Sequence, residues 1–222
     1  MAVWSSLVWL IADLLAAPAY FRSNVLLLNA GVRFADFLVF AYVSHLLAAL
    51  RVSLSREKES ARIDHATGIP NRRAFFEIAE VEVQRARRYQ RPFSLAYLDV
   101  DDFKKVNDRF GHPAGDLLLQ LLAQSIRKDI RAVDTVARLG GDEFALLLPE
   151  TPLQGAKVVC ERIREKFSSR MREKSWPAAF SIGVIHFGTA PASVDAMVKM
   201  ADEQMYAAKK QGKNSIHLQT SS

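Results

Sequence analysis

Apolar residues recur at different spacings in different stretches of the chain, and the spacing in each stretch predicts whether it forms a helix or a strand. From residue 64 onward, amphipathic stretches with helical spacing alternate with short apolar runs of strand length. The pattern predicts helices at 71–90, 102–107, 116–131, 152–172 and 194–210. It predicts strands at 93–100, 134–139, 143–149, 178–187 and 215–219, with a loop at 110–115. Strands separated by helices, with one hairpin between them, favour an α/β (α+β) fold in which helices surround an antiparallel-rich central sheet.

The first 50 residues follow a different pattern, because they are apolar almost throughout. A stretch at 3–17 is interrupted by one aspartate and two serines, and a second stretch at 25–50 is longer than the roughly 20 residues that cross a bilayer. Arg33 and Asp36 lie three residues apart, so on a helix they share a face and offset each other's charge. We therefore expect N-terminal apolar helices at about 3–17 and 25–50, which make residues 1–50 a membrane segment.

Two other interpretations of this N-terminal segment remain open. It is either a remnant of a larger membrane domain whose upstream helices are not part of this sequence, or a helical hairpin that dimerises. Basic residues are more numerous just after Leu50 than in the loop at 18–24, and such residues flank the cytoplasmic ends of membrane helices. This bias predicts a cytoplasmic location for the C-terminal part. Residues 51–63 are polar and contain no glycine or proline, which predicts a helical signalling connector that orients two copies of the chain.

The net charge of +6 does not by itself indicate a nucleic-acid partner. Many of the basic residues lie on predicted helices beside glutamates, a pattern typical of solvated helix faces. No tract of lysine and arginine with interleaved aromatic residues is present, so we expect no nucleic-acid binding. The single cysteine, Cys160, excludes an internal disulfide and fits a small residue in the core.

Acids gather at the end of the predicted strand at 93–100, where Asp99, Asp101 and Asp102 follow one another closely. Such a cluster repels itself unless a cation or a basic partner compensates it. Sites in α/β sheets commonly lie at the carboxyl ends of strands, and carboxylate oxygens suit Mg²⁺, which is typically shared with phosphates. The alternative interpretation is a helix N-cap accompanied by solvated acids.

The stretch from Gly140 to Glu143 places two glycines and two acids at the tip of the predicted hairpin. If the hairpin lies beside the strand at 93–100, Asp142 approaches Asp99, and two carboxylates from two strands suit a divalent-metal site for phosphoryl transfer. Glycines before the acids let a ligand approach the backbone closely. The alternative is an ordinary turn with solvated acids.

Two lysines lie near the end of the last predicted helix. Lys209 and Lys213 are four residues apart, so on a helix they share a face, where two cations suit a triphosphate. Lysines that complement the helix dipole before Gly212 are an equally good interpretation of this segment alone.

Four motifs occur in order along the chain: DHATGIPNRRAF, LDVDDFKKVNDRFGHPAGD, RAVDTVARLGGDEF and ADEQMYAAKKQGKN. Through them the chain from about residue 64 to residue 218 resembles the GGDEF family of diguanylate cyclases. The resemblance implies a catalytic domain at 64–222 with a fold like the palm of nucleotide cyclases and polymerases. It implies the condensation of two GTP into cyclic di-GMP, with release of two pyrophosphates, at a homodimer interface. Together with the apolar N-terminus, it implies a location at the bacterial inner (cytoplasmic) membrane, with the catalytic domain in the cytoplasm.

The resemblance also implies catalytic roles for individual residues. Asp99, the backbone carbonyl of Val100 and Asp142 would hold Mg²⁺ over the GTP phosphates, with Mn²⁺ as an alternative. Asp142 would also act as the base near the 3′-hydroxyl, and Glu143 would support the site. Lys104 would stabilise the charge that develops on the transferred phosphate.

Substrate binding is implied at a second set of positions. Asn107 and Asp116 would hydrogen-bond the guanine edge, with His112 near the nucleotide. Lys209 and Lys213 would grip the β- and γ-phosphates. The family often has arginine at the position of Lys213, so here a point charge would replace a bidentate grip.

An RxxD sequence precedes the hairpin at the position of the family's product-inhibition site. Arg131 would pair with a guanine and a phosphate of cyclic di-GMP, Asp134 would accept a hydrogen bond from a guanine, and Arg162 matches the secondary position. The resemblance therefore implies feedback inhibition by the product.

The opening motif departs slightly from the family pattern, because Ala66 and Ile69 stand where the family has leucine. The change reduces apolar packing where the connector meets the domain. The family's pairing of Asp64 with Arg138 is expected, because both residues are present.

A function of a different class stays open at this point: a catalytically inactive module that acts as a receptor for GTP or cyclic di-GMP. Such a module would be expected to lack the acids of the metal and base positions. Asp99, Asp142 and Glu143 are all present, which favours the enzyme.

Overall fold

The computed structural model describes residues 8, 12, 22–60 and 62–221. The chain divides into two units, residues 1–61 and 62–222, which are described separately. The first unit contains α2, Arg22–Ser60, in which the helix expected at 25–50 runs on without a break. The helix expected at 3–17 lies outside the described residues apart from Val8 and Ala12.

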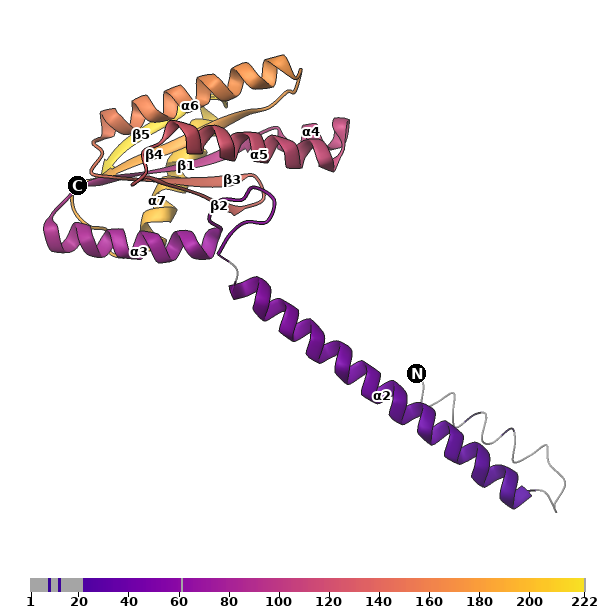
Figure 1. The fold of residues 1–222 in the computed structure, drawn as a ribbon. Helices are drawn as coiled ribbons and strands as arrows, with labels where there is room; N and C mark the ends of the chain where they lie inside the picture. Colours follow the sequence, from indigo (N-terminus) through magenta and orange to yellow (C-terminus); the bar gives the residue numbers. More distant parts are fainter. Residues whose placement is uncertain (1–7, 9–11, 13–21, 61, 222) are drawn as a thin grey trace. The chain divides into compact units, whose positions relative to one another are not determined.

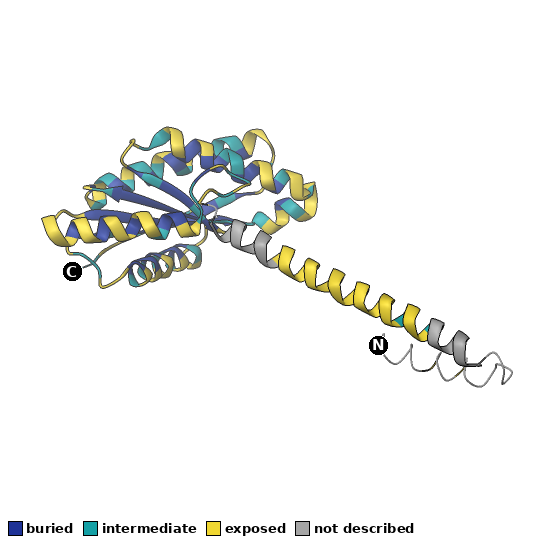
Figure 2. Ribbon diagram, turned by 60° about the horizontal axis from the view of Figure 1, so that its bottom comes forward, coloured by how far each residue is buried: buried dark blue, intermediate teal, exposed yellow. Residues whose placement is uncertain are grey.

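The side chains of α2 are exposed through most of the stretch between residues 29 and 51 (Figure 2). Asn29–Arg51 comprises 23 residues with a mean hydropathy of 1.5, so by length and composition it is a helix that can cross a membrane. This stretch therefore matches one of the two apolar helices expected from the sequence.

The second unit is built on a five-stranded sheet with strand order β2-β3-β1-β4-β5. The strands are β1 Phe93–Asp101, β2 Thr135–Gly140, β3 Glu143–Pro149, β4 Ala179–Phe187 and β5 Ile216–Ser221. Three neighbouring pairs are antiparallel and the pair β4–β5 is parallel. The predicted fold class, an antiparallel-rich sheet surrounded by helices, is therefore confirmed.

Helices cover both faces of this sheet (Figure 1). They are α3 Arg72–Tyr89, α4 Phe103–Phe110, α5 His112–Asp129, α6 Leu153–Glu173 and α7 Val194–Lys210. α5 and α6 pack on one face and α3 and α7 on the other. Each helix turns a buried stripe toward the sheet and an exposed stripe outward, as the helical period of its apolar residues requires (Figure 2).

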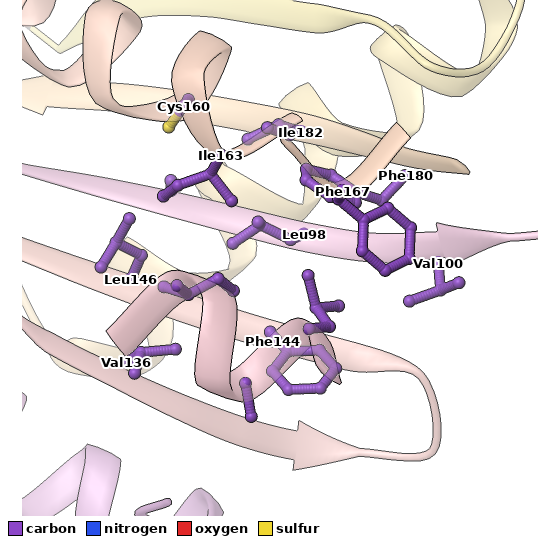
Figure 3. Close-up of a cluster of buried hydrophobic side chains, with 14 of the residues drawn as sticks. Leu98, Val100, Val136, Phe144, Leu146, Cys160, Ile163, Phe167, Phe180 and Ile182 are labelled. Atoms are coloured by element: carbon purple, nitrogen blue, oxygen red, sulfur yellow. The ribbon is translucent and has the colours of Figure 1, made fainter. Parts of the chain in front are cut away.

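The central strand β1 is buried along its whole length and supplies both cores. Its side chains alternate between the faces, so Leu98 and Val100 join the core under α5 and α6, whereas Leu95 and Tyr97 join the core under α3 and α7. Figure 3 shows Leu98 and Val100 among the apolar side chains of the first core. The same alternation places Asp99, at the end of the strand, on the α3 and α7 face.

Cys160 lies fully buried in that first core, as expected from its position on an amphipathic helix (Figure 3). Burial raises the pKa of its thiol to about 12. The thiolate form that reacts with electrophiles is therefore suppressed at neutral pH, and the side chain serves packing.

The loop predicted at 110–115 is wrong, because α5 begins at His112 and only Gly111 separates it from α4. Gly111 has a φ of 83°, a left-handed conformation that lets the chain turn within one residue. Pro113 stands in the first turn of α5, where its missing N–H costs no hydrogen bond. The early start places His112 and Asp116 one turn apart on the same helix face.

α7 lies directly against β4 at Gly183. A Cβ atom at this position would lie 2.1 Å from the backbone N of Met205 and 2.4 Å from the carbonyl O of Ala201. Only glycine permits so close an approach of helix and strand. This contact sets the depth at which the C-terminal end of α7 meets the carboxyl end of β1.

Candidate functional site

The turn of the β2–β3 hairpin has a specific backbone shape. Gly140 pairs with Glu143 across the turn, and the register shifts between Arg138 and Gly140. Gly141 has a φ of 47°, which a side chain would strain. The two glycines thus allow a tight turn that presents the next two residues, both acids, at its tip.

This turn is joined to the end of β1. The backbone N–H of Val100 donates to the carbonyl of Asp142 at 3.2 Å. Asp99 lies directly opposite Glu143 in the antiparallel register. The structure therefore brings together the acids of the hairpin and the first acid of β1, although they are more than 40 positions apart in the sequence.

The carboxylate of Asp99 is buried beside a lysine and has a raised pKa. Asp99 is 8% exposed, and Lys209 Nζ donates to its Oδ1 at 2.6 Å. Burial, opposed by the Lys209 hydrogen bond and reinforced by the charges of Asp142 and Glu143, raises the pKa of Asp99 to about 6. The hydrogen bond from Lys209 therefore offsets only part of the effect of burial on this carboxylate.

The donor atoms at this place fit a divalent cation that shares its coordination with phosphates. In the part of the chain that the structure describes, no three His, Cys, Asp or Glu side chains are arranged to enclose a metal by themselves. Mg²⁺ at phosphate sites commonly takes one or two carboxylates and completes its shell with water and phosphate oxygens. Asp99, Asp142 and the carbonyl of Val100 match that smaller donor set, and a cation would favour the charged form of Asp99 against the burial and the acidic neighbours that raise its pKa.

Asp101, in contrast, forms hydrogen bonds within the protein that link separate elements. It is 3% exposed and accepts hydrogen bonds from Ser181 Oγ at 3.0 and 2.9 Å. The backbone N–H of Asn214 donates to Asp101 Oδ2 at 2.9 Å. The carboxylate therefore ties β1 to β4 and to the turn after α7.

Asp102 stands at the N-cap position of α4 but makes no capping hydrogen bond. Its Oδ1 contacts Lys105 Nζ at 3.0 Å and Lys213 Nζ at 2.9 Å. These hydrogen bonds lower the pKa of Asp102 and raise that of Lys213. The N-cap interpretation therefore holds for the position of Asp102 and fails for its side chain, which pairs with lysines.

The two lysines predicted to share a helix face reach the site from different elements, one from a helix and one from the turn that follows it. Lys209 lies in the last turn of α7, which ends at Lys210. Lys213 follows the helix in a turn where Lys213 and Asn214 have φ angles of 58° and 44°. The prediction of a common helix face is therefore wrong, because the helix ends at Lys210 and Lys213 lies in the turn beyond it. Both ammonium groups nevertheless contact acids at the end of β1.

The residues expected to bind guanine lie on the helical hairpin formed by α4 and α5. Asn107 packs against the backbone of Gly115, where a Cβ atom would lie only 2.0 Å from Asn107 Oδ1. Asp116 follows Gly115 and is exposed, and His112 lies exposed one turn before it. Lys104, in the first turn of α4, is exposed as well. The structure thus brings Asn107 to the start of the turn that carries Asp116.

The turn of the β2–β3 hairpin is also held by Arg138, a residue of β2. The Arg138 guanidinium donates to the carbonyl of Gly141 from Nε at 2.9 Å and from Nη2 at 2.6 Å. Its Nη1 donates to Asp64 Oδ1 at 3.0 Å, which is the pairing expected from the family resemblance. Burial opposes the change, but hydrogen bonds from Thr67 and Arg138 lower the pKa of Asp64. Arg138 thereby connects Asp64, in the motif that opens the domain, to the turn Gly140–Glu143, called the acidic turn below.

The RxxD residues lie at the opposite end of β3 from this turn. Arg131 donates to Asp134 from its backbone N, Nε and Nη2 at 2.8, 3.1 and 2.7 Å, and Asp134 raises the pKa of Arg131. The side chain of Asp134 is 1% exposed. Arg162 Nη2 donates to the carbonyl of Asp129 at 2.5 Å, two residues before Arg131.

A cavity of about 710 Å³ opens beside Arg131. Its lining combines apolar and charged side chains from α3 and from the segments around the start of β2 and the end of β3, among them Ile78, Arg85, Val133 and Glu150. Arg131 therefore lines a space that is bordered by both apolar and charged side chains.

Sequence reasoning missed several residues that position the site. Ser181, the partner of Asp101, is signalled only as a serine within an otherwise apolar strand. Asn214 contributes its backbone N–H, which no side-chain pattern can indicate. Thr151, which contacts Arg131, follows a predicted strand without any distinguishing motif.

Known proteins with a similar sequence identify the family of this chain. The family model "Diguanylate cyclase, GGDEF domain" matches residues 61–215. The chain is 36% identical over 173 residues to the diguanylate cyclase DgcP of Pseudomonas aeruginosa, covering 77% of this chain and 26% of that protein. It is 36% identical over 180 residues to the probable diguanylate cyclase DgcT of Escherichia coli K12, covering 79% of this chain and 38% of that protein. The chain thus spans less than half the length of these curated relatives.

A solved structure agrees with the sequence relatives. The GGDEF domain of DgcB from Caulobacter crescentus, in complex with c-di-GMP, superposes with a TM-score of 0.66 at 29% identity, covering 72% of this chain and 93% of that chain. Fold and site together define an α/β domain with an acidic site at the end of its central strand. With the family model matching residues 61–215, the chain belongs to the GGDEF-domain family of diguanylate cyclases.

Proposed function

We propose that the protein is a diguanylate cyclase that condenses two GTP into cyclic di-GMP and two pyrophosphates. The observation that carries this proposal is the convergence of Asp99, Asp142 and Glu143 from two strands, with Lys209 bonded to Asp99. Such a group of acids suits a metal-assisted attack of a 3′-hydroxyl on an α-phosphate. Catalysis then comes from positioning and from charge stabilisation, without a covalent intermediate on the protein.

In this proposal the metal is held by Asp99, Asp142 and the backbone carbonyl of Val100. Mg²⁺ is the expected ion, with Mn²⁺ as an alternative, and when bound it supplies positive charge next to the reacting phosphate. Asp142 accepts the proton of the attacking hydroxyl, and Glu143 supports the site. Lys104 lies on the first turn of α4, where it stabilises charge on the transferred phosphate.

GTP is bound through its base and its phosphates. Asn107 and Asp116 hydrogen-bond the guanine edge, because acceptors there select the N–H groups that adenine lacks, and His112 lies near the nucleotide. Lys209 and Lys213 exchange their contacts with acids of the β1 end for the β- and γ-phosphates. The support for this assignment is that all of these side chains border the same end of the sheet or the adjoining helical hairpin.

The two halves of the product come from two chains. Each domain offers one set of nucleotide-binding residues, so the active form is a homodimer. We assign residues 1–50 to the membrane segment, 51–63 to the signalling connector and 64–222 to the catalytic domain, at the bacterial inner membrane with the catalytic domain in the cytoplasm. The apolar, exposed stretch Asn29–Arg51 supports this arrangement.

The product inhibits the enzyme at the RxxD residues. Arg131 binds a guanine and a phosphate of cyclic di-GMP, Asp134 accepts from a guanine, and Arg162 takes the secondary position. The cavity beside Arg131 and the hydrogen bond of Arg162 to the neighbouring Asp129 carbonyl support this placement. Asp134 is bonded to Arg131 in this structure, so a guanine that reaches it displaces part of that pairing.

The proposal is tested with the full chain in detergent micelles, supplied with Mg²⁺ and GTP, by chromatographic detection of cyclic di-GMP. Wild type should form the product, and Asp142→Asn should reduce the rate by at least about 100-fold, because it removes a metal ligand and the base. Asp195→Asn changes an exposed acid at the other end of α7 and serves as the matched control.

The alternative, an inactive receptor module, makes a different prediction. It binds GTP or cyclic di-GMP without turnover, and Asp142→Asn then behaves as wild type does in the assay. Absence of product from a folded wild-type chain that still binds nucleotide would replace the enzyme by this receptor.

A further inference from the structure

The guanidinium of Arg131 is fixed along one edge. Nε and Nη2 face Asp134, and Nη2 also donates to the carbonyl of Pro149 at 3.1 Å and to Thr151 Oγ1 at 2.6 Å. Within residues 62–221, Nη1 donates no hydrogen bond, and the Arg131 side chain is 55% exposed. The protein thus holds one edge of the guanidinium and leaves the other edge for a ligand.

Thr151 is anchored on both sides of this contact. It is 6% exposed, and its hydroxyl donates to the carbonyl of Pro149 at 2.9 Å while accepting from Arg131. Its own carbonyl accepts from Ser94 Oγ at 2.7 Å, and Ser94 is fully buried in the central strand β1. The backbone of Thr151 is therefore anchored to β1, and the hydroxyl that contacts Arg131 is held by the Pro149 carbonyl.

We infer that Thr151 is a positioning residue of the inhibitory site, which orients the Arg131 guanidinium so that its Nη1 edge receives cyclic di-GMP. The inference rests on the proposed product inhibition and adds a residue to it. Asp134 belongs to the same four-residue turn as Arg131, so its hydrogen bonds orient the guanidinium relative to that turn. Together with the Pro149 carbonyl, the Thr151 hydroxyl adds a support from outside that turn and so reduces the ordering that ligand binding requires.

The location of Thr151 separates this role from catalysis. Thr151 follows β3 at Pro149, whereas Glu143 begins β3 at the acidic turn. At about 3.3 Å per residue, the strand keeps the two ends roughly 20 Å apart. A change of the Thr151 hydroxyl should therefore alter inhibition and leave the initial rate of the reaction near that of wild type.

Two substitutions at this position isolate the hydroxyl. Thr151→Val keeps the shape and the methyl group, which packs near Gly155, but removes the hydrogen bonds. Its inhibition constant for cyclic di-GMP should rise about tenfold, the effect of one lost hydrogen bond to a charged group. Thr151→Ser keeps the hydroxyl, and its inhibition constant should stay within about twofold of wild type. Arg131→Ala, measured in parallel, should lose inhibition.

The measurements are initial rates of the full chain in detergent micelles at increasing cyclic di-GMP, together with calorimetric binding of cyclic di-GMP in the absence of GTP. If wild type is not inhibited, or Arg131→Ala is inhibited as wild type is, the proposed feedback and this inference fail together. If Arg131→Ala loses inhibition while Thr151→Val matches wild type in both measurements, the inference alone fails. It also fails if Thr151→Ser weakens binding as much as Thr151→Val, because packing and not the hydroxyl would then be responsible.

A measurement on the unaltered chain covers the case in which Thr151→Val does not fold. The ¹⁵N NMR signals of the Arg131 guanidinium, assigned by their loss in Arg131→Lys, should be separate for Nη1 and Nη2, because Nη2 is held by three acceptors. A single averaged signal for the two groups would show a freely rotating guanidinium and overturn the inference.

Discussion

At the scale of single residues, the three aspartates at the end of β1 have three different environments. Asp99 faces the hairpin acids and Lys209, Asp101 is buried against Ser181, and Asp102 pairs with two lysines. From the sequence they form one acidic cluster. Asp99 and Asp101 lie on the same face of β1 but meet different neighbours, because Lys209 reaches Asp99 whereas Ser181 and the turn after α7 reach Asp101. The left-handed conformation of Asp102 directs its carboxylate to the lysines.

The role of Asp101 as a brace leads to a prediction. Asp101→Ala leaves the Asn214 N–H without its acceptor and releases the turn that carries Lys213, so the KM for GTP should rise about tenfold. Asp101→Asn retains one acceptor oxygen and should change the KM less. Steady-state rates of both variants check this; an equal effect of the two substitutions would contradict the proposed brace.

The pairing of Asp64 with Arg138 makes stability depend on pH. The folded protein lowers the pKa of Asp64 from its ordinary value of 3.8, so the pairing stabilises the fold above that pH and is lost as the pH falls through the lowered value. Asp64→Asn should therefore cost about 2 kcal/mol of unfolding free energy at pH 7. The difference from wild type should shrink below about pH 4.

Urea unfolding between pH 7 and pH 3 measures this difference. Glu80→Gln, an exposed acid on α3, is the control and should show no comparable loss. A cost of Asp64→Asn that stays constant down to pH 3 would mean that the carboxylate charge does not contribute.

At the scale of elements, the α4–α5 hairpin shows how a helix start positions a side chain. α5 begins four residues earlier than the sequence pattern indicates, because Gly111 and Pro113 make a one-residue turn instead of a loop. As a result Gly115 stands inside the helix, and its bare backbone is what Asn107 packs against. The glycine is therefore required by a contact and not by a turn.

Gly115→Ala tests the consequence of that contact. A new Cβ would occupy the place of Asn107 Oδ1, so the amide must rotate away and the KM for GTP should rise about tenfold. Fold stability should change little, because the helix propensity of alanine adds up to about 1 kcal/mol while the displacement of Asn107 and the 3.1 Å approach to Phe103 Cζ oppose it. Kinetics and thermal unfolding are measured together.

Gln124→Ala, at an exposed position of the same helix, is the matched control and should leave the KM unchanged. An unchanged KM in Gly115→Ala would remove Asn107 from the proposed guanine contacts.

At the scale of the whole molecule, the proposed function requires two chains. Each domain supplies one set of binding residues, so a single chain cannot complete the product. Below the dissociation constant of the dimer, a tenfold dilution should lower the rate per chain about tenfold. Initial rates of the full chain, diluted in micelles and compared with its oligomeric state by light scattering, check this expectation.

Mixing provides the matching experiment. An excess of Asp142→Asn should suppress wild-type activity, because wild-type chains become trapped in mixed dimers. A rate per chain that is independent of dilution in a monomeric preparation would contradict the need for a partner.

The sequence by itself determined the fold class, the order of the elements and the motifs that place the chain in its family. These features depend on local period and on residue type, both of which are legible along the chain. The long apolar run at 25–50 and the acidic turn at Gly140–Glu143 belong to the same category, because each is continuous in sequence.

Apart from the approach of Asp142 to Asp99 and the Asp64–Arg138 pairing, which the motifs already predict, only the tertiary structure decided which polar groups meet. The bracing of Asp101 by Ser181, the hold of Arg138 on Gly141 and the support of Arg131 by Thr151 all join distant segments or involve backbone atoms. Such contacts are set by strand register and by the depth at which helices pack. Neither quantity has a local pattern, so the residues that position the site became identifiable only once the sheet and its helices were in place.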